Sequence, residues 1–130
     1  MPEYLFDSTV LIDYLRGHLA VRPFIEILLE QPRTVTYSVI TEAELWAGVR
    51  NPQDERRHKD ILSRMKRLGV SSRIARLAGQ RYGRYNSQGL ALPDAIIAAS
   101  ANVHAKTLVT RNTKHFKPLR DEISCEFYSL

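Results

Sequence analysis

Short apolar runs alternate along the chain with longer stretches in which apolar residues recur every three or four positions. The short runs predict strands at Glu3–Phe6, Thr34–Val39, Thr107–Thr110 and Ser124–Tyr128, with a brief one near Leu68–Val70. The longer stretches predict helices at Ser8–Arg16, Leu19–Glu30, Thr41–Val49, Gln53–Lys66, Ser71–Ser87 and Ala95–Val103, and a helical turn at Thr113–Phe116. Such alternation is typical of a mainly parallel central sheet with helices on both faces. We therefore predict an α/β protein with three layers, α/β/α, folded as a single domain over residues 1–130.

Length and composition agree with one small domain. A chain of 130 residues with 44% hydrophobic content can bury one core. Cys125 is the only cysteine, which excludes an internal disulfide and fits a reducing compartment. No apolar run approaches the roughly 18 residues of a membrane span, and acidic residues in the first turns do not fit a signal peptide. We expect a cytoplasmic protein without membrane contact.

Three acidic residues lie where an apolar run stops and a helix is expected to start. Asp7 follows the first predicted strand, Glu44 lies just after the second, and Asp94 follows Pro93 before the apolar helix Ala95–Val103. In a parallel α/β sheet the carboxyl ends of the strands line one crevice, so residues far apart in sequence can meet there. Carboxylates gathered in this way repel one another unless they share a proton or bind a cation. The spacing predicts one acidic pocket.

Helix capping offers an alternative for each acid taken singly. Thr41-x-x-Glu44 fits a capping box, Asp94 after Pro93 fits a first helical turn, and Asp7 can cap the helix that follows it. Capping does not explain why all three acids also follow strands. We therefore favour the pocket.

The donors available decide which metal such a pocket would take. Oxygen ligands without cysteine or paired histidine suit a hard cation, Mg²⁺ or Mn²⁺. The four histidines, which are far apart and lack i, i+4 pairing, do not suit zinc, and we expect them to be solvated or packed; they are His18, His58, His104 and His115. A bound metal ion would generate hydroxide from its water for attack on phosphorus.

Basic residues are concentrated between Arg50 and Arg84. This segment holds eleven Lys and Arg against three Asp and Glu, a local charge of +8 in a chain of +5. A basic helical arm beside an acidic pocket would hold a polyanion by its backbone while one phosphate enters the pocket. Solvated arginine-rich helix faces are the simpler alternative.

Four segments resemble the motif blocks of PIN-domain ribonucleases, and most closely those of VapC-type toxins. They are FDSTVLIDYL at 6–15, ITEAELWAGV at 40–49, LPDAIIAASA at 92–101 and LVTRNTKHF at 108–116, and they occur in the family's order. The resemblance implies a Mg²⁺- or Mn²⁺-dependent endoribonuclease whose products carry a 5′-phosphate and a 3′-hydroxyl. It also implies a homodimer, an RNA substrate and a cognate VapB-type antitoxin.

The fourth block departs from the family pattern. Asn112 stands where many members place Asp, so its amide could bind the metal or orient a water but brings no charge, which puts a second metal in doubt. As an alternative, Asn112 would cap the short helix after it. The resemblance thus assigns Asp7, Glu44, Asp94 and Asn112 as metal ligands and catalytic residues, with Thr110 as a catalytic hydroxyl that orients water.

Two further expectations concern the helices around the pocket. Asp13 is expected to pair with Arg16 three positions on. An apolar groove for the antitoxin segment is expected from residues of the third and fourth helices, namely Leu45, Trp46, Val49, Ile61 and Leu62.

Other function classes remain open. A non-catalytic RNA-binding module would explain the basic arm but not the three acids, and a non-toxin RNA-processing PIN nuclease would explain both. A receiver or haloacid-dehalogenase domain needs a second acid beside Asp7 or a Lys after a late strand. Here Ser8 and Thr9 follow Asp7, and Lys106 precedes its strand, which ranks that class last.

Overall fold

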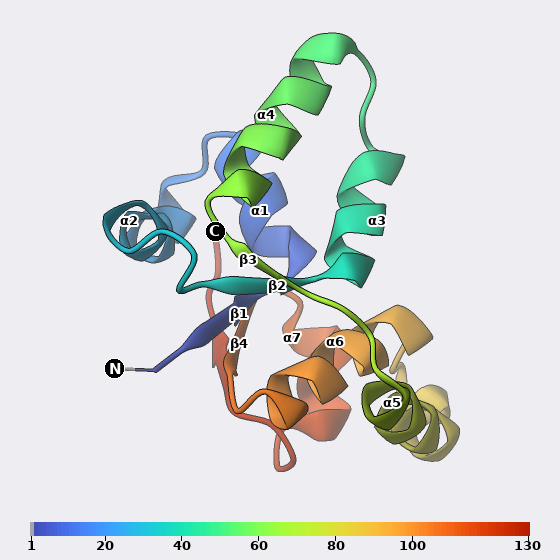
Figure 1. The fold of residues 1–130 in the computed structure, drawn as a ribbon. Helices are drawn as coiled ribbons and strands as arrows, with labels where there is room; N and C mark the ends of the chain where they lie inside the picture. Colours follow the sequence, from blue (N-terminus) through green and yellow to red (C-terminus); the bar gives the residue numbers. More distant parts are fainter. Residues whose placement is uncertain (1) are drawn as a thin grey trace.

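The computed structural model describes residues 2–130 and confirms the predicted α/β architecture (Figure 1). Its strands are β1 (Tyr4–Phe6), β2 (Thr36–Ser38), β3 (Lys66–Leu68), β4 (Thr107–Thr110) and β5 (Cys125–Phe127). The α-helices are α1 (Ser8–Leu15), α2 (Arg22–Glu30), α3 (Val39–Ala47), α4 (Pro52–Ser63), α5 (Ser72–Tyr85), α6 (Leu92–Val103) and α7 (Thr113–Phe116). Three short 3-10 helices complete the order: η1 (Leu19–Val21), η2 (Asn86–Gln88) and η3 (Lys117–Leu119).

All five strands are parallel and lie in the order β3-β2-β1-β4-β5. The central strand β1 pairs with β2 through Leu5 and Thr36 and with β4 through Leu5 and Leu108. The chain therefore adds strands on one side of β1 first and on the other side later. Such a reversal opens a crevice at the carboxyl ends of the strands, here between β1 and β4.

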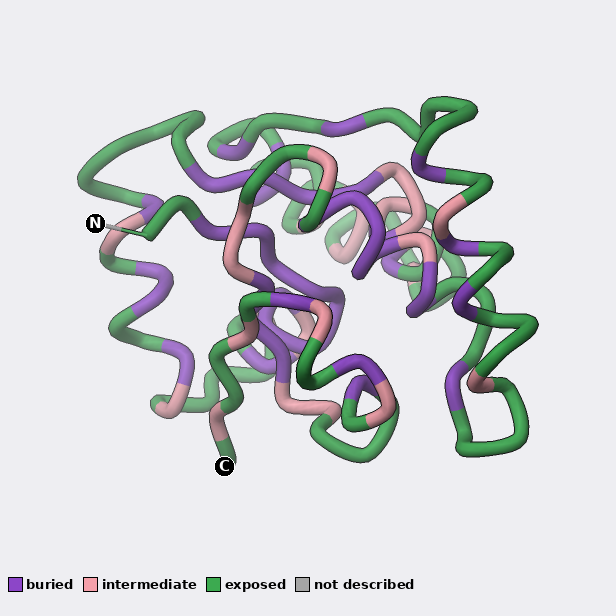
Figure 2. The backbone as a smooth tube through the Cα atoms, turned by 90° about the horizontal axis from the view of Figure 1, so that it is seen from below, coloured by how far each residue is buried: buried purple, intermediate pink, exposed green. Residues whose placement is uncertain are grey.

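Helices α1 to α4 cover one face of the sheet and α5 to α7 the other (Figure 1). Because side chains of a strand alternate between faces, Tyr4 and Phe6 pack in the core under α1 and α2, and Leu5 in the core under α6. Phe6 meets Phe24 of α2 edge to face, at 6.2 Å between ring centroids. Figure 2 shows buried segments through the middle of the molecule and exposed residues around its rim.

Some boundaries differ from prediction, and each difference has a local cause. The third strand is Lys66–Leu68, two residues earlier than expected, because its pairing with β2 overrides the helical pattern that led into it. Pro23 lies in the first turn of α2, where its missing N–H costs nothing, so the predicted helix Leu19–Glu30 divides into a 3-10 turn and an α-helix. Within residues 2–130 no helix is long and apolar enough to cross a membrane.

Candidate active site

Asp7 lies at the carboxyl end of β1, beside the switch point of the sheet. It is buried, and its Oδ2 accepts hydrogen bonds from Thr110 Oγ1 at 2.7 Å and from Thr9 Oγ1 at 3.1 Å. Although Asp7 occupies the N-cap position of α1, its side chain forms no capping hydrogen bond. Burial raises the pKa of Asp7, and the bond from Thr110 opposes this. The Asp7 carboxyl group therefore does not cap the helix and is available to the acidic pocket.

Glu44 lies in the middle of α3, so the capping-box alternative is wrong. The helix starts at Val39, and Ser38 caps it by accepting the Ile40 N–H at 3.1 Å. Thr41 is buried inside the helix, and its hydroxyl has no hydrogen-bond partner. Glu44 instead reaches the acidic site, where burial, then the charges of Asp7 and Asp94, raise its pKa to about 7.

Asp94 is buried in the first turn of α6, directly after Pro93. Its Oδ2 lies 3.0 Å from His115 Nδ1, so His115 is part of the site rather than merely solvated, as its isolated place in the sequence led us to expect. Burial and the charge of Asp7 raise the pKa of Asp94, while His115 opposes both. Only the position of His115 within the fourth block could have indicated this contact.

Parallel topology explains how the three acids meet. Asp7 ends the central strand, Glu44 follows β2 on one side of it, and Asp94 comes from the helix that leads into β4 on the other side. The raised pKa of both Glu44 and Asp94 has the Asp7 charge among its causes. A buried acid with like-charged neighbours favours either a proton or a bound cation.

The donor set fits a hard divalent cation. All three acids offer oxygen, and Mg²⁺ usually keeps several waters and needs only one or two protein carboxylates. Within residues 2–130, no group of three or more His, Cys, Asp or Glu side chains lies close enough together to hold a metal ion by itself. A water-rich Mg²⁺ or Mn²⁺ site suits this open arrangement better than a structural metal cage.

Asn112 and Thr110 lie beside Asp7 at the end of β4. Thr110 is fully buried, and besides donating to Asp7 its Oγ1 accepts the Asn112 backbone N–H at 3.0 Å. Asn112 takes the N-cap position of α7, yet its side chain makes no capping hydrogen bond. The capping alternative for this amide is therefore wrong, and its role towards a metal stays a prediction.

Asp13 does not pair with Arg16. It is fully buried and forms two hydrogen bonds with Arg111, from Nε at 2.8 Å and from Nη2 at 3.1 Å. Arg111 stands between Thr110 and Asn112, so this ion pair adjoins the acidic site. Sequence reasoning missed it because 98 positions separate the two residues.

The basic segment is not one arm. Helix α4 packs with the core on one face of the sheet through Ile61 and Leu62, and α5 packs on the other through Ile74 and Ala78 (Figure 1). Several of its cations are also engaged locally in ion pairs, namely Lys59 with Glu55, Arg64 with Asp60, Arg67 with Glu42, and Arg81 and Arg84 with Glu122. Of the residues predicted for the antitoxin groove, Ile61 is buried and lines no described cavity, whereas Leu45 lines the cavity beside Glu44, and Trp46 and Leu62 line another surface cavity.

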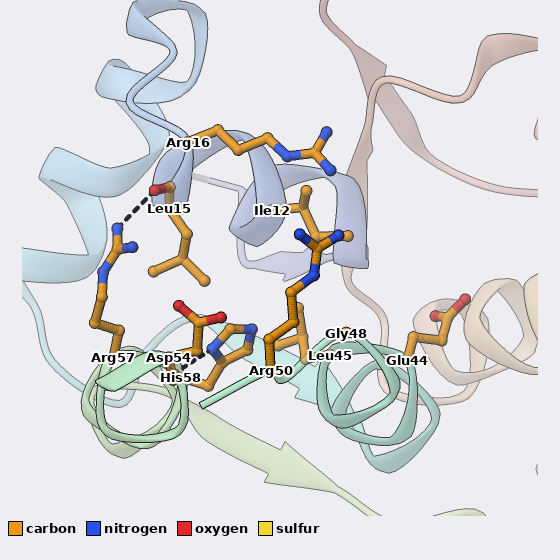
Figure 3. A pocket seen from close by; sticks show the side chains of 10 residues that line it. All are labelled: Ile12, Leu15, Arg16, Glu44, Leu45, Gly48, Arg50, Asp54, Arg57 and His58. Carbon is orange, nitrogen blue, oxygen red and sulfur yellow. Dashed lines mark hydrogen bonds between the residues drawn. The ribbon is translucent and has the colours of Figure 1, made fainter. Parts of the chain in front are cut away.

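A cavity of about 290 Å³ lies beside Glu44, between α1, α3 and α4 (Figure 3). Ile12, Leu15 and Leu45 supply apolar lining, and Arg57 is held there by its hydrogen bond to the Leu15 carbonyl at 2.6 Å. Figure 3 shows Arg16 and Arg50 extending toward Ile12 from different elements, while the Glu44 side chain points away from both arginines. Neither of these two guanidinium groups takes part in an ion pair within residues 2–130.

Comparison with known proteins agrees with this geometry. The profile of the PIN domain family matches residues 4–120. The chain belongs to the PIN domain family. Ribonuclease VapC10 of Mycobacterium tuberculosis is 33% identical over 125 residues, which cover 95% of this PIN domain chain and 92% of that protein. Ribonuclease VapC19 of the same organism is 32% identical over 119 residues, covering 90% and 94%.

Solved structures resemble the whole PIN domain. A toxin–antitoxin complex from Klebsiella pneumoniae superposes with a TM-score of 0.78 and 32% identity, and covers 95% of each chain. VapBC2 from Rickettsia felis, bound to a DNA fragment from its promoter, has a TM-score of 0.80 at 23% identity, covering 97% of this chain and 98% of that one. The second match supports the fold alone.

Proposed function

We propose that this protein is a metal-dependent endoribonuclease of the VapC type, which hydrolyses RNA phosphodiester bonds as the toxin of a toxin–antitoxin pair. The observation that supports the proposal is that Glu44 of α3 and Asp94 of α6 both lie near enough to Asp7, at the end of β1, for its charge to raise their pKa. Membership of the PIN family and relatives named as ribonucleases support the same activity.

Asp7 and Asp94 would hold Mg²⁺ or Mn²⁺, with Glu44 and Asn112 as further oxygen donors. When bound, such an ion lowers the pKa of its water and supplies hydroxide for in-line attack on phosphorus. The hydroxyl of Thr110 orients the Asp7 carboxylate, and the His115 ring orients that of Asp94. Glu44, with a pKa of about 7 before any cation binds, can take up or release a proton near neutral pH.

Arg16 and Arg50 offer the substrate a place beside these acids. Both guanidinium groups border the cavity next to Glu44 and are not committed to a described ion pair. Arginine binds phosphate with parallel hydrogen bonds, and contacts to the backbone hold a strand without reading its sequence. In our proposal the RNA strand crosses this pair while one of its phosphates faces Asp7.

A VapB-type antitoxin and a homodimer complete the proposal. A structural relative at 32% identity is a toxin–antitoxin complex that matches nearly the whole chain. An acidic pocket attracts a cationic side chain, so an Arg or Lys of the antitoxin could pair with Asp7 and Asp94 in place of a metal. The cavity between α1, α3 and α4, which Leu45 of the predicted groove lines, offers a place for its apolar side chains.

Cleavage of single-stranded RNA in Mg²⁺ tests the activity. Asp7→Asn should lose more than about a hundredfold in kcat, because loss of a partner that only supports a metal ligand already costs 10- to 100-fold. EDTA should abolish cleavage by the wild type. Asp121→Asn, which removes an exposed acid near the C-terminus, serves as the control and should cleave normally. Cleavage that survives Asp7→Asn in pure protein would refute the assignment.

A further inference from the structure

A second buried polar cluster adjoins the acidic site and has no part in the proposed chemistry. At its centre Asp13 of α1 is fully buried and accepts two hydrogen bonds from Arg111 and a third from the Tyr128 hydroxyl at 2.7 Å. The three residues come from the first helix, from the turn after β4 and from the segment that follows β5. We call Asp13, Arg111 and Tyr128 the anchor cluster.

The residues of the anchor cluster keep their protonation states near neutral pH. Burial pushes the pKa of Asp13 upward, but the hydrogen bonds from Arg111 and Tyr128 outweigh it, and the pKa lies below its usual value. Burial and the bond to Asp13 raise the pKa of Tyr128, so its hydroxyl keeps the proton that it donates. The cluster therefore stays a fixed anion, cation and neutral donor through the neutral range, which suits a mechanical role rather than proton transfer.

Hydrogen bonds connect the anchor cluster to Asp7. The Arg111 backbone N–H donates to Thr9 Oγ1 at 3.1 Å, and Thr9 donates in turn to Asp7 Oδ2. One residue on, the Asn112 N–H donates to Thr110 Oγ1 at 3.0 Å, and Thr110 donates to the same oxygen of Asp7. Each hydroxyl accepts from the turn, which directs its own proton toward the carboxylate.

The position of residues 111–112 therefore decides how Asp7 is held. If this turn moved, both hydroxyls would lose the N–H that orients them, and Asp7 would lose two fixed donors. The side chain of Arg111 holds the turn through a pair of charge-assisted bonds to Asp13, which are stronger and more directional than neutral ones. Tyr128 in turn fixes Asp13 Oδ2, the oxygen that also accepts from Arg111 Nε.

We infer that Asp13, Arg111 and Tyr128 are positioning residues, through which the C-terminal segment sets the geometry of Asp7 and of the turn that carries Asn112. The expected effect on metal binding and catalysis rests on the proposed function, in which Asp7 is a metal ligand. The geometric part concerns the protein alone and can be tested without metal or RNA.

The test compares Tyr128→Phe with Tyr4→Phe. Both variants delete one tyrosine hydroxyl that donates to a carboxylate near β5, but Tyr4 bonds to Glu126 at 2.9 Å and has no link to Asp7. Hydrogen exchange followed by NMR in the metal-free protein should show faster exchange at the Arg111 and Asn112 amides in Tyr128→Phe only. Equal exchange in both variants at these two amides would overturn the inference.

Calorimetric titration of Mn²⁺ gives a second readout. Tyr128→Phe should bind Mn²⁺ about tenfold more weakly and lose kcat more than it changes KM, since groups that orient metal ligands contribute about 10- to 100-fold. Tyr4→Phe should match the wild type. A purely structural role would lower the thermal stability of Tyr128→Phe and leave its Mn²⁺ affinity unchanged, which contradicts the inference.

If Tyr128→Phe does not fold, Arg111→Lys provides a second variant for the same test. Lysine keeps the charge but cannot form both bonds to Asp13. Its control is Arg81→Lys, because Arg81, although more deeply buried than Arg111, also donates a hydrogen bond to a side chain, here to Asn102 at 2.6 Å in the opposite layer. If wild type binds Mn²⁺ and cleaves RNA while Arg111→Lys equals Arg81→Lys in both assays, the inference fails and the proposed function stands. A wild type that does neither refutes the function instead.

Discussion

Glu44 and Asp94 owe their raised pKa first to burial and then to the neighbouring acids, whereas burial alone raises the pKa of Asp7. Glu44 shows the effect most clearly, with a pKa raised from 4.5 to about 7 by burial and by the charges of Asp7 and Asp94. A carboxyl that binds its proton more tightly in the folded state stabilises that state below the unfolded pKa, and the gain is lost as pH rises through the folded value. Here the window lies between about pH 4.5 and 7.

We therefore expect the thermal stability of the metal-free protein to fall between pH 5 and 8, and the fall to be smaller in Glu44→Gln. Scanning calorimetry at several pH values measures both. Adding Mn²⁺ should reverse the trend in the wild type, because a cation favours the ionised acids and its binding strengthens as they lose protons. Identical pH profiles for wild type and Glu44→Gln would mean that folding does not raise the pKa of Glu44.

Asn112→Asp restores the charge that many family members carry. If the amide faces the metal, the added carboxylate should tighten Mn²⁺ binding about tenfold, since affinity at oxygen sites rises with ligand charge. Gln80→Glu adds the same charge on the exposed face of α5 and should leave the affinity within about twofold. Titration calorimetry compares the two. An unchanged affinity in Asn112→Asp would assign Asn112 to the turn alone.

At the scale of elements, the two basic helices act separately because they lie in opposite layers. Of the basic segment, only α4 and the turn before it border the cavity beside Glu44, whereas α5 packs on the opposite face of the sheet. Local composition predicted the charge correctly and its location wrongly, because a segment of sequence carries no signal for the face of the sheet that it will cover.

Changing Arg16 and Arg50 together to Gln should therefore weaken RNA binding several-fold and reduce its salt dependence by roughly one to two units, near one per lost phosphate contact. The matched control changes Arg73 and Arg76 of α5, which line a separate surface cavity. Binding titrations at a series of salt concentrations give both slopes. A larger effect from the α5 pair would place the RNA on the other face.

For the whole molecule, the alternating hydrophobic pattern was sufficient to predict the fold class and the order of the elements, and it led to the prediction that three acids meet. These features follow from local periodicity and from the rule that parallel strands end at one edge. The contacts of Asp13 with Arg111 and Tyr128, and of Asp94 with His115, were not predicted, since they join residues far apart in the sequence and depend on how the elements pack. The capping box failed because Ser38 competes with Thr41 for the helix start.

The proposed toxin role involves the whole molecule and its antitoxin partner, and growth experiments test it. Expression of the wild type alone should arrest growth, and co-expression with a neighbouring gene for a small antitoxin should restore it. Asp7→Asn should be harmless in both settings, because the arrest depends on cleavage. Harmless expression of active wild type in a host that lacks the antitoxin would favour a housekeeping RNA-processing nuclease.

The central claim is that Asp7 and Asp94 share a divalent cation, with Glu44 beside it. Anomalous diffraction from crystals soaked in Mn²⁺ tests this most directly, because it locates the ion without reference to activity. We expect one strong peak in contact with the carboxylates of Asp7 and Asp94, and its loss in Asp94→Asn. A protein that cleaves RNA in Mn²⁺ but shows its peak elsewhere, or shows the same peak in Asp94→Asn, would contradict the account.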